Sequence, residues 1–304
     1  MKVALVQMDI AWLDAAANRE TAERLMLSAE KSDIYVLPEM WDTGVTTEPQ
    51  DIASPNPSKG EGALRHDTPH PFREGDGGKA VGAETLLWMQ RMADKLDAAV
   101  CGSIAVKAQD GSYRNRLYFV KPAYPQPLLK GKGEIKSVPW LPPTFGSGED
   151  LGEAVQWYDK HHLFSYGGET EHYTPGQERV TVEWRGVRFR LSICYDLRFP
   201  LWLRNRDDYD VLICVASWPS VRMHAWNVLL AARAIENQSF VLGVNRIGRD
   251  PYCEYSGGTC VVDPFGFSTA CPEGEACILT QTLDLRRQKS FREKFPVLRE
   301  MDTP

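Results

Sequence analysis

The chain has 304 residues, with 35 Lys and Arg against 41 Asp and Glu and a formal net charge of −6 at pH 7. This acidic balance gives no reason to expect nucleic acid or an anionic membrane as a partner, because both repel negative charge. Hydrophobic residues make up 43% of the sequence, which is enough for the core of one large α/β domain. We therefore expect an enzyme that acts on a small molecule.

Strand-like and helix-like segments alternate from the N-terminus. Short apolar runs, with or without period-two alternation, predict strands, and apolar residues at helical spacing predict helices. In chain order we expect a strand at 3–7, a helix at 18–28, a strand at 34–37, a helix at 84–96, and strands at 99–106 and 116–120.

The alternation continues in the second half of the chain. There we expect a strand at 187–193, a short helix near 201–203, a strand at 211–216, a helix at 225–237, and strands at 240–244, 258–262 and 276–283. This pattern is typical of an α/β protein. We predict two β-sheets packed together, with helices outside them.

Two stretches interrupt the alternation. Residues 48–79 and 121–153 are rich in proline, glycine and charged side chains. Loops of this length in a compact domain are commonly the rim of an active site, although a surface insertion without function fits the composition equally well. Neither stretch resembles a domain linker and no internal repeat is evident. We expect one domain over 1–304, with a C-terminal tail near 284–304.

Targeting signals and cysteine content indicate the cellular compartment of a protein. The N-terminal apolar run is too short for a signal peptide, and no segment reaches the roughly 18 to 20 apolar residues of a membrane span. The cysteines are odd in number and show no C-x-x-C spacing: Cys101, Cys194, Cys214, Cys253, Cys260, Cys271 and Cys277. This usage is typical of a reducing compartment. We expect a cytoplasmic protein that does not interact with membranes.

The most informative position is Cys194, at the end of the strand over 187–193. Asp196, Arg198 and Pro200 follow it and predict a tight turn into a short helix. A nucleophile on such a turn faces a cleft together with backbone N–H groups, an arrangement that other hydrolases build around serine. A buried structural cysteine is the competing interpretation, because free cysteine is among the most buried residue types.

A cysteine hydrolase also needs a proton acceptor, a donor for the oxyanion and an acid for the leaving group. Glu39 stands just past the end of a strand, after Pro38. Lys160 follows two aromatic residues, and Glu169 lies in a turn-rich loop. Taken one at a time, each is more typical of a solvated surface side chain, so the case depends on their combination.

The order and contexts of these residues resemble one family, the nitrilase superfamily of carbon–nitrogen hydrolases, along nearly the whole chain. The motifs are Leu-Pro-Glu at 37–39, Lys-x-His-Leu-Phe at 160–164, Glu-x-x-x-Tyr-x-Pro-Gly at 169–176, Ile-Cys-Tyr-Asp-Leu-Arg-Phe-Pro at 193–200, Ala-Ser-Trp-Pro at 216–219, Ala-Arg-Ala-Ile-Glu-Asn at 232–237, Asn-Arg at 245–246 and Asp-Pro-Phe-Gly at 263–266. The resemblance implies an α/β fold, the four-layer α-β-β-α sandwich of this family.

The resemblance also implies roles for single residues. Glu39 corresponds to the general base, Lys160 to the catalytic lysine, Cys194 to the nucleophile, and Glu169 to a second glutamate with a structural or catalytic role. The separation between Glu39 and Lys160 is longer than is usual in the family, and both inserts fall within it. The implied reaction passes through a cysteine thioester and needs no cofactor or metal.

The chemistry of these side chains agrees with those roles. A nearby ammonium is expected to stabilise the thiolate of Cys194. Glu39 can take the thiol proton and return it to departing ammonia. Lys160 and the backbone N–H of Tyr195 would hold the oxyanion, and Glu169 would orient Lys160 or the attacking water.

The residues after the nucleophile narrow the branch of the family. True nitrilases carry Trp-Glu there and aliphatic amidases Arg-Asp, whereas Tyr195 and Asp196 begin a motif similar to that of the omega-amidase group. This resemblance implies hydrolysis of ω-amides of short α-keto dicarboxylates, namely 2-oxoglutaramate and 2-oxosuccinamate. Another carbon–nitrogen hydrolase activity, on N-carbamoyl amino acids or other aliphatic amides or on a nitrile, is the alternative.

An anionic substrate calls for a cation in the pocket. By position, Arg198 or Arg222 can supply it, although a structural ion pair is the simpler role for an arginine. Phe164 and Trp218 can form walls of the pocket or can belong to the core alone.

Two other classes of function, a zinc site and a non-enzymatic interaction module, are alternatives. His161, His162, Glu169 and His172 could form a zinc site, but they lack the H-E-x-x-H spacing, and adjacent histidines would face opposite sides of a strand. A catalytically silent interaction module is the non-enzymatic alternative, and the intact set of Glu, Lys and Cys argues against it.

Assembly is expected from the resemblance. The helix at 225–237 carries Arg233 and Glu236 three residues apart, which predicts a local ion pair. In the family this region lies near a subunit contact, so we expect a homodimer or a higher homo-oligomer. The tail near 284–304 either crosses that contact or is free.

Overall fold

Two six-stranded β-sheets form the centre of the fold in the computed structural model, which describes residues 1–53, 82–123 and 154–300. The first sheet has the order β14-β1-β2-β3-β4-β5. Its strands are β1 (Lys2–Gln7), β2 (Ile34–Val36), β3 (Ala99–Lys107), β4 (Tyr113–Val120), β5 (Val155–Asp159) and β14 (Cys277–Thr282). Within it, β1, β2 and β3 are parallel neighbours.

The second sheet repeats this plan, with the order β13-β12-β9-β8-β7-β6 and a parallel centre of β7, β8 and β9. Its strands are β6 (Thr181–Trp184), β7 (Val187–Ile193), β8 (Val211–Ala216), β9 (Phe240–Asn245), β12 (Cys260–Val262) and β13 (Ser268–Ala270). A separate two-stranded ribbon consists of β10 (Ile247–Arg249) and β11 (Glu254–Ser256).

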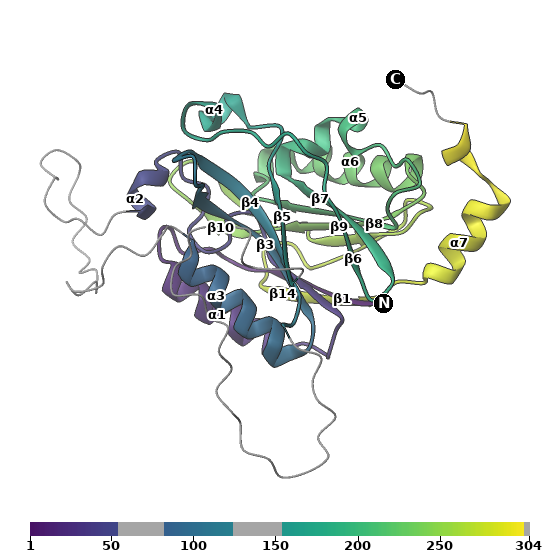
Figure 1. The fold of residues 1–304 in the computed structure, drawn as a ribbon, viewed down its shortest axis with the longest axis horizontal. Helices are drawn as coiled ribbons and strands as arrows, with labels where there is room; N and C mark the ends of the chain where they lie inside the picture. The colour runs from purple at the N-terminus through teal and green to yellow at the C-terminus, as the bar shows by residue number, and fades with distance from the viewer. Residues whose placement is uncertain (54–81, 124–153, 301–304) are drawn as a thin grey trace, which may run out of the picture.

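Helices cover the outer face of each sheet, as predicted (Figure 1). In Figure 1, α1 and α3 lie outside the first sheet and α5 and α6 outside the second. The helices are α1 (Ala15–Ser28), α2 (Pro49–Ala53), α3 (Ala83–Leu96), α4 (Glu169–His172), α5 (Pro200–Leu203), α6 (Met223–Glu236) and α7 (Leu285–Lys294). Among the described residues, none of the helices combines the length and apolar character that crossing a bilayer requires.

The main core lies between the two sheets because alternate residues of their strands face each other. In β7, the apolar residues Phe189, Leu191 and Ile193 belong to this core, and the Phe189 ring packs 5.6 Å from that of Phe119 on β4. Two further cores lie beneath the helices on the outer faces. Face-to-face packing brings the ends of strands from both sheets together, which positions the site described below.

Most predicted elements are confirmed, some with shifted ends. The strands at 187–193 and 211–216 agree residue for residue, whereas the strand predicted from 116 begins at Tyr113. The helix predicted from 18 begins at Ala15, because the Asp14 side chain caps it by accepting from the backbone N of Ala17 at 3.0 Å. Residues 54–81 and 124–153, most of the two inserts, lie outside the described residues.

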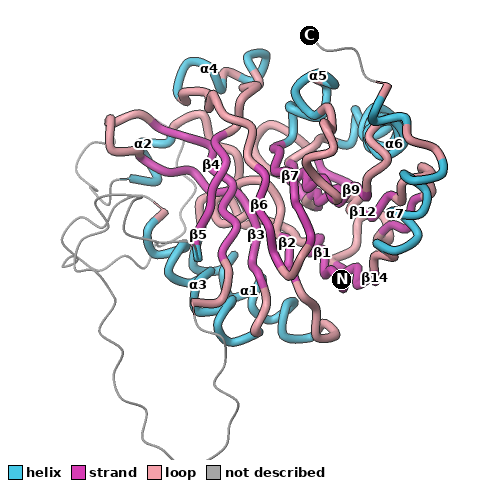
Figure 2. Tube along the Cα trace, turned by 45° about the vertical axis from the view of Figure 1, so that its right-hand side comes forward, coloured by secondary structure: helices cyan, strands magenta, loops and turns pink. Residues whose placement is uncertain are grey.

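The segment after β14 was expected either to cross a subunit contact or to be free, and it contains a helix, α7, that packs on its own chain (Figure 2). Gln288 Nε2 donates to the backbone oxygen of Asp210 at 2.7 Å and to that of Gln238 at 3.1 Å. Arg292 Nη1 reaches the Asp210 carboxylate at 3.1 Å. These contacts are polar, so apolar spacing could not reveal the helix.

Candidate active site

Cys194 directly follows β7 and begins a strained 3₁₀ turn at Cys194–Arg198. The φ of Cys194 is 46°, in the left-handed region that residues other than glycine seldom adopt. The Asp196 carboxylate holds this turn by accepting a hydrogen bond from the backbone N of Ile193 at 3.0 Å. The predicted strand-to-helix turn around the cysteine is therefore confirmed in its geometry.

Glu39 follows β2 in the first sheet, yet the second sheet holds its carboxylate. Its Oε2 accepts a hydrogen bond from the backbone N of Ser217 at 2.9 Å, and its backbone N donates to Ala216 O at 3.4 Å. Ala216 is the last residue of β8, so the ends of β2 and β8 meet at this point. The side chain of Glu39 is 1% exposed and is not the solvated strand-end carboxylate that composition alone favours.

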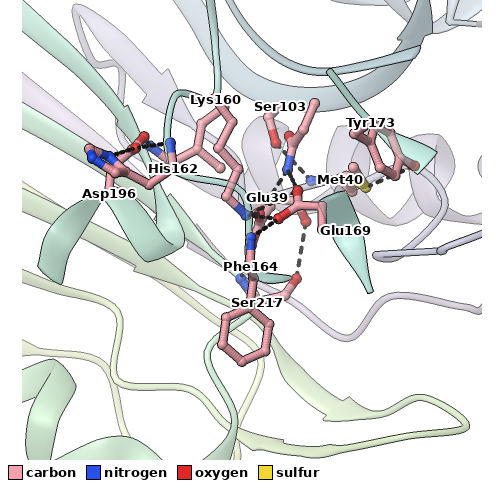
Figure 3. Close-up of polar contacts among 12 residues, drawn as sticks. Glu39, Met40, Ser103, Lys160, His162, Phe164, Glu169, Tyr173, Asp196 and Ser217 are labelled. Atoms are coloured by element: carbon pink, nitrogen blue, oxygen red, sulfur yellow. Dashed lines mark hydrogen bonds and ion pairs between the residues drawn. The ribbon is translucent and has the colours of Figure 1, made fainter. Parts of the chain in front are cut away.

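Lys160 lies between the two glutamates (Figure 3). Its Nζ is 2.8 Å from Glu39 Oε1 and 2.8 Å from Glu169 Oε2. Glu169 begins α4, and its Oε2 also accepts from the backbone N of Phe164 at 2.7 Å. Glu169 was expected to orient Lys160 or the attacking water, and its carboxylate contacts the ammonium of Lys160.

Asn115 on β4 completes this cluster, and it was not among the site residues predicted from the sequence. Its Nδ2 donates to Glu39 Oε1 at 2.8 Å and to Glu169 Oε1 at 3.1 Å, so one amide group satisfies both carboxylates. Asparagine is depleted in strands. The strand was predicted to begin one residue later, at 116, so no local pattern singled out Asn115.

The ammonium of Lys160 favours the thiolate of Cys194, as expected, but other effects in the cluster oppose it. Burial raises the pKa of the Cys194 thiol well above its usual range, the charge of Glu39 adds to this, and the opposing effect of Lys160 does not compensate. Burial alone would lower the pKa of Lys160, but Glu169 and Glu39 outweigh it and raise that pKa well above the ordinary value. The Cys194 thiol therefore ionises less readily than an ordinary cysteine, beside an ammonium paired with two carboxylates.

A cavity of about 340 Å³ opens over these residues. All nine predicted site residues line it: Glu39, Lys160, Phe164, Glu169, Cys194, Tyr195, Arg198, Trp218 and Arg222. The Arg198 guanidinium lies 4.9 Å from the Trp218 ring and that of Arg222 lies 5.3 Å from the Phe164 ring. Across the described parts of the chain, neither guanidinium has a carboxylate within 4.0 Å.

The outer part of the cavity was not predicted. A hairpin formed by β10 and β11 supplies four of the residues that line it, and the segment after Glu39 supplies three more. The additional lining residues are Val45, Thr46, Thr47, Tyr166, Gly167, Ser217, Pro219, Asp250, Tyr252, Cys253 and Tyr255. The Asp-Pro pair at 250–251 is a turn signal that could have revealed the hairpin.

The histidines weighed as zinc ligands have other partners. His161 and His162 were expected on opposite faces of a strand, but they follow β5, and their ring centroids are 4.5 Å apart. His161 Nδ1 is 2.6 Å from Gly176 O and His162 Nδ1 is 2.9 Å from Asp196 Oδ1. Within 1–53, 82–123 and 154–300, no three His, Cys, Asp or Glu side chains are placed to hold a metal ion.

The chain is similar to known proteins along nearly its whole length. Residues 2–293 match the family model described as carbon-nitrogen hydrolase. The chain is 34% identical to omega-amidase YafV of Yersinia enterocolitica, over 99% of this chain and 97% of that protein. It is 29% identical to 2-oxoglutaramate amidase of Bacillus subtilis (strain 168), over 97% and 95% respectively.

Among solved structures, XC1258 from Xanthomonas campestris is described as a CN-hydrolase superfamily protein with an arsenic adduct in its active site. It matches with a TM-score of 0.77 and 32% identity, over 100% of this chain and 98% of that one. Nit3 of Saccharomyces cerevisiae shares the fold, with a TM-score of 0.72 at 22% identity over 97% of this chain and 94% of that one.

Proposed function

The chain belongs to the carbon–nitrogen hydrolases of the nitrilase superfamily, and we propose that it is an omega-amidase that releases ammonia from 2-oxoglutaramate and 2-oxosuccinamate. Two relatives with the printed names omega-amidase and 2-oxoglutaramate amidase support this choice at 34% and 29% identity. The observation that carries the proposal is the pair of arginines, Arg198 and Arg222, in the same cavity as the Cys194 thiol. Such guanidiniums suit a substrate carboxylate.

The reaction begins with proton transfer from the Cys194 thiol to Glu39, and both side chains line the same cavity. This transfer leaves the net charge of the cluster unchanged, because Glu39 loses the charge that Cys194 gains. The thiolate then attacks the amide carbon, and the oxyanion that forms accepts hydrogen bonds from Lys160 Nζ and the backbone N–H of Tyr195. Losing one such donor typically lowers the rate by about 10²–10³.

The leaving group departs with the proton that Glu39 carries. Glu39 donates it to the amide nitrogen, the C–N bond breaks, and ammonia and a thioester on Cys194 remain. A water molecule then gives a proton to Glu39 and attacks the thioester carbon. Collapse of this second tetrahedral intermediate breaks the C–S bond and releases the keto acid, and the sulfur regains its proton from Glu39. Glu169 and Asn115 hold Lys160 and Glu39 in place throughout.

A substrate panel tests this proposal. Ammonia release is measured for 2-oxoglutaramate, 2-oxosuccinamate, glutamine, asparagine, an N-carbamoyl amino acid and a small nitrile, with Cys194→Ala as the control. The two keto-acid amides are expected to give the highest kcat/KM, and Cys194→Ala none. Preference for the N-carbamoyl acid or a neutral amide would assign another activity in the family. Turnover by Cys194→Ala would reject the nucleophile.

We also propose that residues 1–304 form a single domain in a cytoplasmic homodimer or higher homo-oligomer. The seven free thiols favour a reducing compartment. On α6, the side chains of Val228 and Ile235 are 52% and 54% exposed, as a helix near a subunit contact would be, and the predicted pair of Arg233 and Glu236 is confirmed at 3.1 Å. Light scattering of the purified protein tests the assembly, and a monomer mass would reject it.

A further inference from the structure

The reacting groups come from different sheets and need a connection between them. Lys160 directly follows β5 of the first sheet, and Cys194 directly follows β7 of the second. No disulfide joins the ends of these strands, because all seven cysteines are free thiols. The alignment of the ammonium with the thiol therefore depends on non-covalent contacts where the two strands end.

The carboxylate of Asp196 makes that connection (Figure 3). Its Oδ1 accepts hydrogen bonds from the backbone N and from Nδ1 of His162, both at 2.9 Å. Its Oδ2 accepts from the hydroxyl of Tyr158 at 2.7 Å and from the backbone N of Ile193 at 3.0 Å. Three of the four donors belong to the first-sheet segment that includes Lys160, and the fourth belongs to the Cys194 turn.

We propose that Asp196 and His162 are positioning residues, which hold the segment of Lys160 against the turn of Cys194. The proposal rests on the roles given above to Lys160 and Cys194, but not on the identity of the amide. Neither His162 nor Asp196 belongs to the lining of the cavity. Their effect is therefore expected in kcat, with little change in KM.

Geometry and burial favour a directed hydrogen bond at His162. The Asp196 side chain is fully buried and its Oδ1 also accepts from the backbone N of His162, so we take Nδ1 of His162 as the donor of this hydrogen bond. The imidazole is also stacked on the ring of Phe199, with 3.6 Å between centroids. Unpairing a buried carboxylate is costly, so loss of the Nδ1–H donor would displace the Cys194 turn, the Lys160 segment, or both.

Two substitutions separate the hydrogen bond from the ring. His162→Phe keeps a ring stacked on Phe199 and removes the donor, whereas His162→Asn loses the ring and keeps an N–H donor near the place of Nδ1. We expect His162→Phe to lower kcat by about tenfold or more with KM within about twofold, and His162→Asn to retain most of kcat. His224→Phe, at an exposed histidine of α6 outside the cavity lining, is the matched control and should be unchanged.

Alkylation of Cys194 by iodoacetamide, followed by mass spectrometry, gives a readout that needs no substrate. Its rate should fall in His162→Phe and persist in His162→Asn, even if the proposed amide proves wrong. Equal loss of kcat in both variants, full kcat in His162→Phe, or a rise in KM alone would each overturn the proposal. If His162→Phe does not fold, Tyr158→Phe removes another donor to the same carboxylate, and wild-type kcat and alkylation in that variant would overturn it as well.

Discussion

The carboxylate of Glu39 is bonded at 2.9 Å to the backbone N of Ser217, although Glu39 belongs to the first sheet and Ser217 to the second. The carboxylate that we propose as the general base is thus oriented by the backbone of the opposite sheet. Its position depends on the packing of the two sheets and on the register of β8 beside β7. Substitutions that keep this contact should therefore show the effect of a residue on kcat separately from its effect on the free energy of unfolding.

Glu39→Gln tests the base. Glutamine keeps the shape, but its one oxygen can replace either Oε2, which accepts from Ser217 N, or Oε1, which accepts from Lys160 and Asn115. We therefore expect the free energy of unfolding to fall by about 1–3 kcal/mol. We expect kcat to fall by about 10²–10⁴, because proton transfer from Cys194 is lost. Ammonia release and thermal unfolding are measured on the same sample. A variant that loses stability as strongly as activity would contradict the assignment of a chemical role.

Asn115→Leu tests the amide that bridges the two carboxylates. Both glutamates lose a donor in a buried site, so the free energy of unfolding should fall by about 1–3 kcal/mol and kcat should fall as well. Asn205→Leu is the control, because Asn205 is equally buried and hydrogen-bonded outside the cavity lining. It should lose stability and keep the kcat of its folded fraction. Normal kcat in folded Asn115→Leu would show that Asn115 is structural only.

Arg198→Leu and Arg222→Leu test recognition of the substrate carboxylate. A hydrogen bond to a charged group contributes about 1.5–3 kcal/mol, so KM for 2-oxoglutaramate should rise by about 10- to 100-fold. A neutral amide should show a much smaller change. Arg286→Leu, at an exposed arginine of α7, is the control. Unchanged KM in both pocket variants would remove these arginines from substrate binding.

The left-handed φ of Cys194 predicts that backbone strain at the nucleophile lowers the stability of the folded protein. Cys194→Gly should be more stable than Cys194→Ala by about 1 kcal/mol, because glycine adopts φ = 46° without strain. Both variants should be inactive. The same pair of substitutions at Cys214, inside β8, should give the opposite order. Chemical denaturation measures all four, and a less stable Cys194→Gly would argue against strain at this turn.

The raised pKa of Cys194 predicts how stability depends on pH. A thiol that ionises less readily in the folded protein than in the unfolded chain stabilises the fold below about pH 8.5, and this contribution is lost as pH rises through the folded-state pKa. The stability of wild type relative to Cys194→Ala should therefore decrease above about pH 8.5. Denaturation between neutral and alkaline pH measures this difference. An increase would show that Lys160 stabilises a thiolate.

Motifs carry the residues to which we assign the reaction, and all of them line one cavity. Lys160 and Cys194 directly follow β5 and β7, and Glu39 lies three residues after β2. Strands were predicted ahead of Glu39 and Cys194, but not ahead of Lys160. Asn115 has no such motif, because its role depends on a register between β4 and β5 that no local pattern contains. The raised pKa of the Cys194 thiol could not be predicted, for a similar reason. The neighbouring ammonium can be inferred from the order of residues, but the depth of burial cannot.

The division of the site between the two sheets has a consequence for biogenesis. A chain that has formed only one sheet has the cysteine without its base, or the base without its cysteine. Such an intermediate has no carboxylate beside the thiol, so we expect it to hydrolyse no amide. Catalytic competence then appears only with the last docking step, and activity during refolding should recover together with the packing of the sheets and not before it.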